Sequence, residues 1–159
     1  MKPTEGVGPT NPGTGRPVAI DISRRLAHEP ASVIEARAAL SPLERAVDPD
    51  TFQTLRLLVT ELVGNSVRHA QSRTTEEIEL SVQATRGMIR IEVTDAGSEF
   101  APLRRSQEVD ATSGRGLQIV QALCDRWGTV TQEHTRVWCE LLGAGQLARE
   151  LDAPTASSP

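Results

Sequence analysis

Glu61 and Asn65 stand one helical turn apart in a stretch, residues 55–70, whose apolar residues recur at helical spacing. At about 100° per residue they share one side of the helix with Arg68 and His69, and the apolar residues gather on another side. A carboxylate and a carboxamide in this spacing can hold a hydrated cation and orient a reacting hydroxyl. The same residues also suit the polar face of an ordinary surface helix, which is the interpretation that this helix alone favours.

Asp95 is a second acid in an unusual place. Ile89, Ile91 and Val93 alternate with polar residues, as in a half-buried strand, and Asp95 continues their apolar row. An isolated carboxylate on an apolar face is costly, so it needs a hydrogen-bond donor. The N–H groups of the turn at residues 96–98 would supply one, as would the amine of a ligand.

Gly114 and Gly116 directly precede a predicted helix that begins its apolar stripe at Leu117. The free N–H groups and the positive end of the dipole at a helix start favour a phosphate. A pair of glycines is also a plain lead-in to many helices, so this motif is weak by itself. The irregular stretch before it, residues 99–112, is typical of a lid or a binding loop.

These residues must be positioned by strands and helices that the rest of the pattern predicts. Strands are expected over 18–22, 78–83, 89–94, 129–132 and 136–142, and helices over 30–43, 48–70 and 116–127. The last helix is expected to include Trp127 and to end at Gly128. The layout predicts an α+β fold, a two-layer sandwich of a mixed, mainly antiparallel sheet covered on one face by helices.

The length of 159 residues suits one domain, expected over residues 17–143. Residues 1–16 are rich in Gly, Pro and Thr and are expected to be a disordered N-terminal tail, with a flexible C-terminal tail over 144–159. The net charge of −4 argues against nucleic acid as a partner.

Other features narrow the class of protein further. No apolar run approaches the roughly 20 residues of a membrane span, and the first residues do not form a signal peptide, so a cytoplasmic location is expected. Cys124 and Cys139 sit in apolar patterns and are expected to be core residues. The three histidines, His28, His69 and His134, have no metal-ligand spacing.

Taken together, the three polar motifs follow a known order: Glu61-x-x-x-Asn65, then Asp95-x-Gly97, then Gly114-x-Gly116. The chain resembles the GHKL (histidine-kinase-like) ATPases, whose Bergerat-type fold carries ATP-binding boxes in this order. Within them it is most similar to the anti-sigma factor kinases, small serine/threonine kinases that regulate bacterial sigma factors. TELVGNSVRHA, VTDAG, GRGLQIVQALCDRWG and RVWCEL carry the likeness, which covers residues 18–142.

The resemblance implies a role for each matching residue. Asn65 would coordinate the Mg²⁺ that bridges the ATP phosphates, and Glu61 would orient or deprotonate the attacking hydroxyl. Asp95 would accept the adenine amino hydrogen, and Gly97 would let the base approach the backbone. Further residues expected at the nucleotide are Gly114 and Gly116 through their N–H groups, and Arg68, His69 and Leu117 in the pocket wall. Apart from the resemblance, which does not fix the sequence of the lid, Arg104, Arg105 and Arg115 are expected as counter-charges to phosphate.

The function implied by the resemblance is an ATP-dependent protein serine/threonine kinase. Its expected substrate is an anti-sigma factor antagonist with a STAS domain, its second expected partner is a sigma factor held inactive, and homodimers are expected. Direct binding to nucleic acid or to a membrane is not expected. A histidine-kinase fragment is a poorer match, because no helix pair with a phosphoacceptor histidine precedes the ATP-binding motifs.

An alternative is a non-catalytic nucleotide-binding module that acts through protein contacts. The chain departs from the family pattern in three places, and the first and the last of them favour this alternative. No second glycine closely follows Gly97, no glycine lies between Ser98 and Gly114, and Thr135-Arg136 stand where many relatives have Gly-Lys.

Overall fold

The computed structural model describes residues 18–69, 77–95, 115–131 and 134–143. Its elements, in chain order, are β1 (Val18–Leu26), α1 (Ala31–Ala39), the 3₁₀ helix η1 (Ser41–Leu43), α2 (Pro49–His69), β2 (Ile78–Thr85), β3 (Met88–Asp95), α3 (Arg115–Leu123), β4 (Arg126–Thr131) and β5 (Thr135–Leu142). The two expected tails and the expected loop at 99–112 lie outside the described residues.

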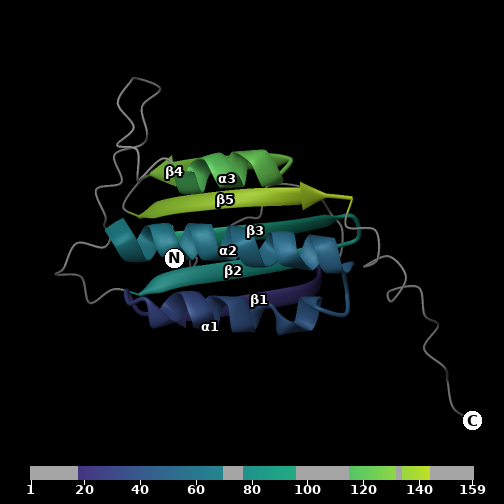
Figure 1. The fold of residues 1–159 in the computed structure, drawn as a ribbon, viewed down its shortest axis with the longest axis horizontal. Coiled ribbons are helices and arrows are strands. Elements are labelled where there is room, and N and C mark those ends of the chain that lie inside the picture. Colours follow the sequence, from purple (N-terminus) through teal and green to yellow (C-terminus); the bar gives the residue numbers. More distant parts are fainter. Residues whose placement is uncertain (1–17, 70–76, 96–114, 132–133, 144–159) are drawn as a thin grey trace, which may run out of the picture.

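The strands form one sheet in the order β1-β2-β3-β5-β4, and the three α-helices lie side by side over one of its faces (Figure 1). The α+β sandwich expected from the sequence is therefore confirmed. The sheet was expected to be mixed, but each pairing among the described strands is antiparallel. Two helices separate β1 from β2, and their up-and-down course brings the chain back antiparallel to β1.

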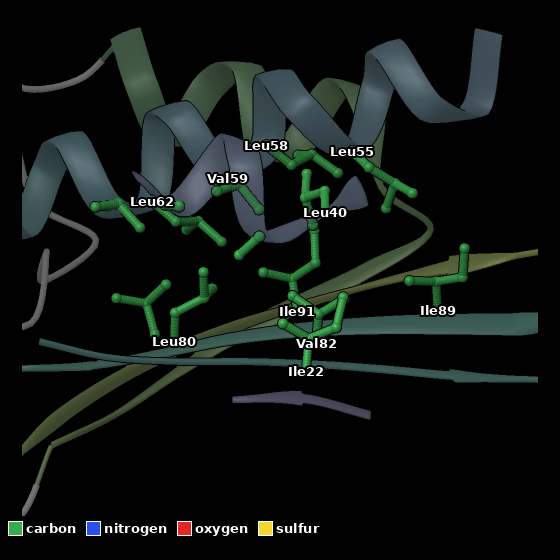
Figure 2. Close-up of a cluster of buried hydrophobic side chains, with 14 of the residues drawn as sticks. Ile22, Leu40, Leu55, Leu58, Val59, Leu62, Leu80, Val82, Ile89 and Ile91 are labelled. Atoms are coloured by element: carbon green, nitrogen blue, oxygen red, sulfur yellow. The ribbon is translucent and has the colours of Figure 1, made fainter. Parts of the chain in front are cut away.

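The core lies between α2 and the middle of the sheet. Figure 2 shows four apolar side chains of α2 directed at the sheet: Leu55, Leu58, Val59 and Leu62. On the sheet side they meet residues of β2 and β3: Leu80, Val82, Ile89 and Ile91. Because the same helix carries Glu61 and Asn65, the burial of its apolar side fixes how those polar residues are presented.

The start of α2 is set by Asp48, as the sequence predicts. The Thr51 N–H donates to Asp48 Oδ1 over 2.9 Å, and the Thr51 hydroxyl donates to Oδ2 over 2.6 Å. These hydrogen bonds to the ionised form lower the pKa of the Asp48 carboxyl below its ordinary value. Pro49 occupies the first helical position, where its missing N–H costs nothing.

The last helix is shorter than its pattern predicts, because α3 ends at Leu123 and Trp127 belongs to β4. The chain leaves the helix at Asp125, which binds β5 twice. Its N–H donates to the Glu140 carbonyl over 2.9 Å, and its carboxylate accepts the Leu142 N–H over 2.7 Å. The hydrogen bonds to β5 therefore end the helix before Trp127, although the apolar residues keep a helical spacing up to Trp127.

The prediction that Gly128 ends a helix is wrong. Gly128 lies inside β4, opposite Trp138 of β5. A Cβ on Gly128 would lie 2.9 Å from the Trp138 ring. The glycine thus lets the large ring lie against the backbone of the edge strand, an arrangement known to support strand glycines.

The face of the sheet opposite the helices carries a network of charges. Arg90 is central, with its guanidinium 2.7 Å from Glu140 and 3.1 Å from Glu92. The same guanidinium lies 4.4 Å from the centre of the Trp138 ring, a cation–π contact. Arg136 reaches Glu92 over 3.2 Å, so its charge is directed away from the helices.

Both cysteines are free thiols, and the expectation that they serve as core residues is confirmed for Cys139. Burial raises the pKa of the Cys139 thiol to about 12, so it is protonated and unreactive at neutral pH. Cys124 is half-buried, packs against the core, and donates its S–H to the Val120 carbonyl over 2.8 Å.

Candidate functional site

The first turn of α3 approaches the polar side of α2 at Gly116. A Cβ added at Gly116 would lie 2.9 Å from Glu61 Oε2 and 2.9 Å from Asn65 Nδ2. Such distances are shorter than real Cβ contacts, so only glycine permits this approach. Gly116 therefore meets Glu61 and Asn65 in space, although they are far apart in the sequence.

Asn65 is a buried carboxamide, 6% exposed, whose Oδ1 accepts a hydrogen bond of 2.5 Å from the Arg68 guanidinium. Together with the Glu61 carboxylate, this oxygen belongs to the ligand types that Mg²⁺ prefers. Within the described ranges, no cluster of three acidic, histidine or cysteine side chains could hold a metal unaided. Phosphate oxygens and water would complete the coordination shell of a cation here. The cation would take the place of the Arg68 guanidinium at Asn65 Oδ1.

Beside Asn65 a small cavity connects α2 with three other elements. Its volume is about 10 Å³, roughly the room that one water needs. Its lining comes from α2 (Leu62, Asn65, Ser66), β3 (Val93, Asp95), α3 (Leu117) and β5 (Thr135, Val137). A nucleotide base is much larger than one water, so a bound base would have to widen this cavity.

Asp95 ends β3 on the buried face, as its sequence pattern predicts, and is 3% exposed. Its cross-strand neighbours are Ile78 and Thr135. The Thr135 hydroxyl is buried and makes no hydrogen bond within the part of the chain that the structure describes. His28 approaches from the other side, with its Nε2 3.4 Å from Asp95 Oδ1. A polar ligand reaching this place would meet a carboxylate and a hydroxyl together.

Thr135 and His28 were not predicted as site residues. Thr135 continues the inward row of Val137 and Cys139 by one more step, so extending that row would have found it. His28 lies in the connection between β1 and α1, and no spacing in the sequence relates it to Asp95. Ser66, also missed, follows Asn65 directly and is buried against the same cavity.

The predicted residues thus divide into three groups. The structure brings together Glu61, Asn65, Arg68, Asp95, Gly116 and Leu117. For two residues only the backbone position is described, at the end of α2 for His69 and at the start of α3 for Arg115. Four lie outside the described residues: Gly97, Arg104, Arg105 and Gly114.

Replacing Gly116 with alanine is expected to weaken Mg-ATP binding by about tenfold, or about 1.4 kcal/mol. The new Cβ would displace the ends of Glu61 and Asn65, and these side chains can move without disturbing the core. Alanine is also the better helix former, so the free energy of unfolding should not fall. Calorimetric titration and urea unfolding measure the two effects separately.

Gly64→Ala is the matched control, because this glycine also lies in a helix close to the site. Its added Cβ would lie 3.6 Å from the Arg68 guanidinium, an ordinary contact. The variant should gain up to about 1 kcal/mol of stability and keep its affinity for nucleotide. Equal affinities of the two alanine variants would contradict the role given to Gly116.

Glu61, Asn65, Asp95 and Gly116 thus lie in one region of the α+β sandwich. The sequence model of the histidine kinase-like ATPase domain matches residues 26–140, which contain all four. The chain belongs to the family of histidine kinase-like ATPase domains. No protein in a search of curated sequences matches it.

Membership defines the coarse function, an ATP-binding, kinase-like module. Domains of this family bind ATP, typically with Mg²⁺, and use it for hydrolysis or phosphoryl transfer. None of the helices within the described ranges has the length and apolar content needed to cross a membrane.

Proposed function

We propose that this chain is a protein serine/threonine kinase of the anti-sigma factor type, which phosphorylates a Ser or Thr of an anti-sigma factor antagonist and binds a sigma factor. The observation that carries the proposal is the position of Glu61. Its carboxylate lies with Asn65 against Gly116, where a cation and the phosphates of ATP would be bound. A carboxylate in that place can accept the proton of an attacking hydroxyl.

In the proposed reaction the hydroxyl oxygen of the partner forms a bond to the γ-phosphorus of ATP. The bond from that phosphorus to the bridging oxygen breaks, and ADP leaves. Glu61 accepts the proton of the hydroxyl. Asn65 would bind the cation, and Asp95 would bind the adenine base. Mg²⁺, when bound, neutralises phosphate charge, which together with positioning supplies most of the catalysis in phosphoryl transfer.

A groove of about 400 Å³ along α1 and the start of α2 supports a protein partner. Ile34 is 70% exposed there, and Arg37, Glu44, Phe52 and Arg56 also line the groove. An exposed apolar side chain in a groove with two guanidinium groups and one carboxylate suits a partner with apolar and mainly acidic residues. The variant Ile34→Asp should lose capture of the antagonist and keep its affinity for ATP, as measured by pull-down and calorimetry.

The direct test is incubation of the protein with the antagonist and γ-labelled ATP, with calorimetry to show that nucleotide is bound. Label on the antagonist that disappears when its acceptor Ser or Thr is changed to Ala supports the kinase. Saturable ATP binding without transfer would favour the alternative, a nucleotide-dependent binding module. Arg136 gives that alternative some support, because it lies on the outer face of the sheet and does not supply a lysine-like charge to the site.

A further inference from the structure

His28 is a buried histidine that the proposed reaction does not use. Its side chain is 9% exposed and that of Asp95 is 4% exposed, and Nε2 of His28 lies 3.4 Å from Asp95 Oδ1. Neither ring nitrogen of His28 makes a hydrogen bond to any other group within the described residues. Asp95 is thus the polar group that His28 faces.

The position of His28 is fixed by a compact turn between β1 and α1. The Ser32 hydroxyl donates to the Ala27 carbonyl over 2.7 Å, and the Ser32 N–H donates to the Glu29 carbonyl over 3.0 Å. The first of these bonds closes a turn that contains His28, the second closes the turn directly after it, and Ser32 itself is buried. The turn places the backbone of His28 beside the end of β3, and the burial of the imidazole restricts its rotation.

An imidazole N–H beside a buried carboxylate has two effects. It stabilises the ionised form, which burial alone would disfavour, and it orients one carboxylate oxygen. The other residues that line the cavity with Asp95 are apolar or uncharged, from α2, β3, α3 and β5. His28 is accordingly an ionisable neighbour of Asp95, at 3.4 Å, and the described lining of the cavity adds no other charged side chain.

We propose that His28 is a positioning residue that makes the site selective for adenine over guanine. It donates from Nε2 to Asp95, which stays ionised and accepts the exocyclic amine of adenine. Guanine presents a carbonyl oxygen at the same place, and an ionised carboxylate repels it. Without the imidazole, Asp95 is more readily protonated, and a protonated carboxyl can donate to that carbonyl. The inference rests on the proposed binding of adenine at Asp95.

The test compares ATP and GTP binding by calorimetry for the wild type, His28→Leu and His28→Gln. In His28→Leu the ratio of ATP to GTP affinity should fall by about tenfold or more, because ATP loses and GTP gains a hydrogen bond. The Gln side chain offers an N–H near the position of Nε2, so His28→Gln should restore most of the ratio. Urea unfolding at pH 7 confirms that each variant is folded.

A merely structural role for His28 predicts a different result, because it would weaken both nucleotides alike and leave the ratio unchanged. That result, or a Gln variant no more selective than the Leu variant, overturns the proposal. A wild type that binds neither nucleotide overturns it together with the proposed function. A wild type that prefers ATP and loses this preference in His28→Leu, but transfers no phosphate, overturns the kinase alone.

Discussion

Replacing Glu61 with glutamine is expected to slow phosphoryl transfer to the antagonist by about 10²-fold or more, the range that a general base supplies. Glutamine keeps the size and hydrogen-bonding ability of the side chain, so the contact with Gly116 and the position of Asn65 should persist. It cannot accept the proton of the hydroxyl. Affinity for Mg-ATP should therefore change by less than about threefold, since the lost group acts on the transferred proton.

Single-turnover transfer of label at saturating ATP measures the rate without interference from binding. Glu79→Gln is a suitable control, because it makes the same chemical change on an exposed strand position away from the site. Its ion pair with Arg25, at 3.7 Å, is largely in solvent and should contribute little. Equal rates for the two glutamine variants would remove Glu61 from the reaction and leave the binding module as the better description.

Leu58→Ala is expected to lower the free energy of unfolding by about 2–5 kcal/mol. Leu58 is fully buried between α2 and the sheet, and its removal would leave a cavity that the surrounding strands cannot close. For a domain of this size, the loss is a large part of the total stability.

The neighbouring residue provides the control. Leu57 is 42% exposed on the same helix, and Leu57→Ala should change stability by no more than about 0.5 kcal/mol. Urea unfolding of both variants, with similar slopes against denaturant, gives the difference directly. A Leu57 variant as unstable as the Leu58 variant would show that α2 is packed on its outer side as well.

The sequence predicts those parts of the fold that follow from local patterns. β2 and β3 each have one buried face, so their alternation of apolar and polar residues is strong, and α2 has a broad apolar side and a clear start at Asp48. The end of α3 could not be predicted in this way. Trp127 fits the helical spacing, and only the hydrogen bonds of Asp125 to β5 show that the chain has already turned into a strand.

The site shows the same division. Glu61, Asn65, Asp95 and Gly116 belong to short motifs with a physical rationale, and the structure brings them into one region. The approach of His28 to Asp95 depends on the order of β1, β2 and β3 in the sheet, which no local pattern contains. A Cβ at Gly64 would make an ordinary contact with the Arg68 guanidinium at 3.6 Å, so no close approach among the described residues requires glycine there.

The cavity beside Asn65 is shared by α2, β3, α3 and β5, so a molecule bound there would join the helix at the centre of the sandwich to elements near its edge. Binding restricted to the folded chain adds to its stability, by about 2.7 kcal/mol at a ligand concentration 100 times Kd. The lifetime of this protein against proteolysis would then follow the nucleotide supply of the cell. Starvation for ATP would reduce its amount as well as its activity.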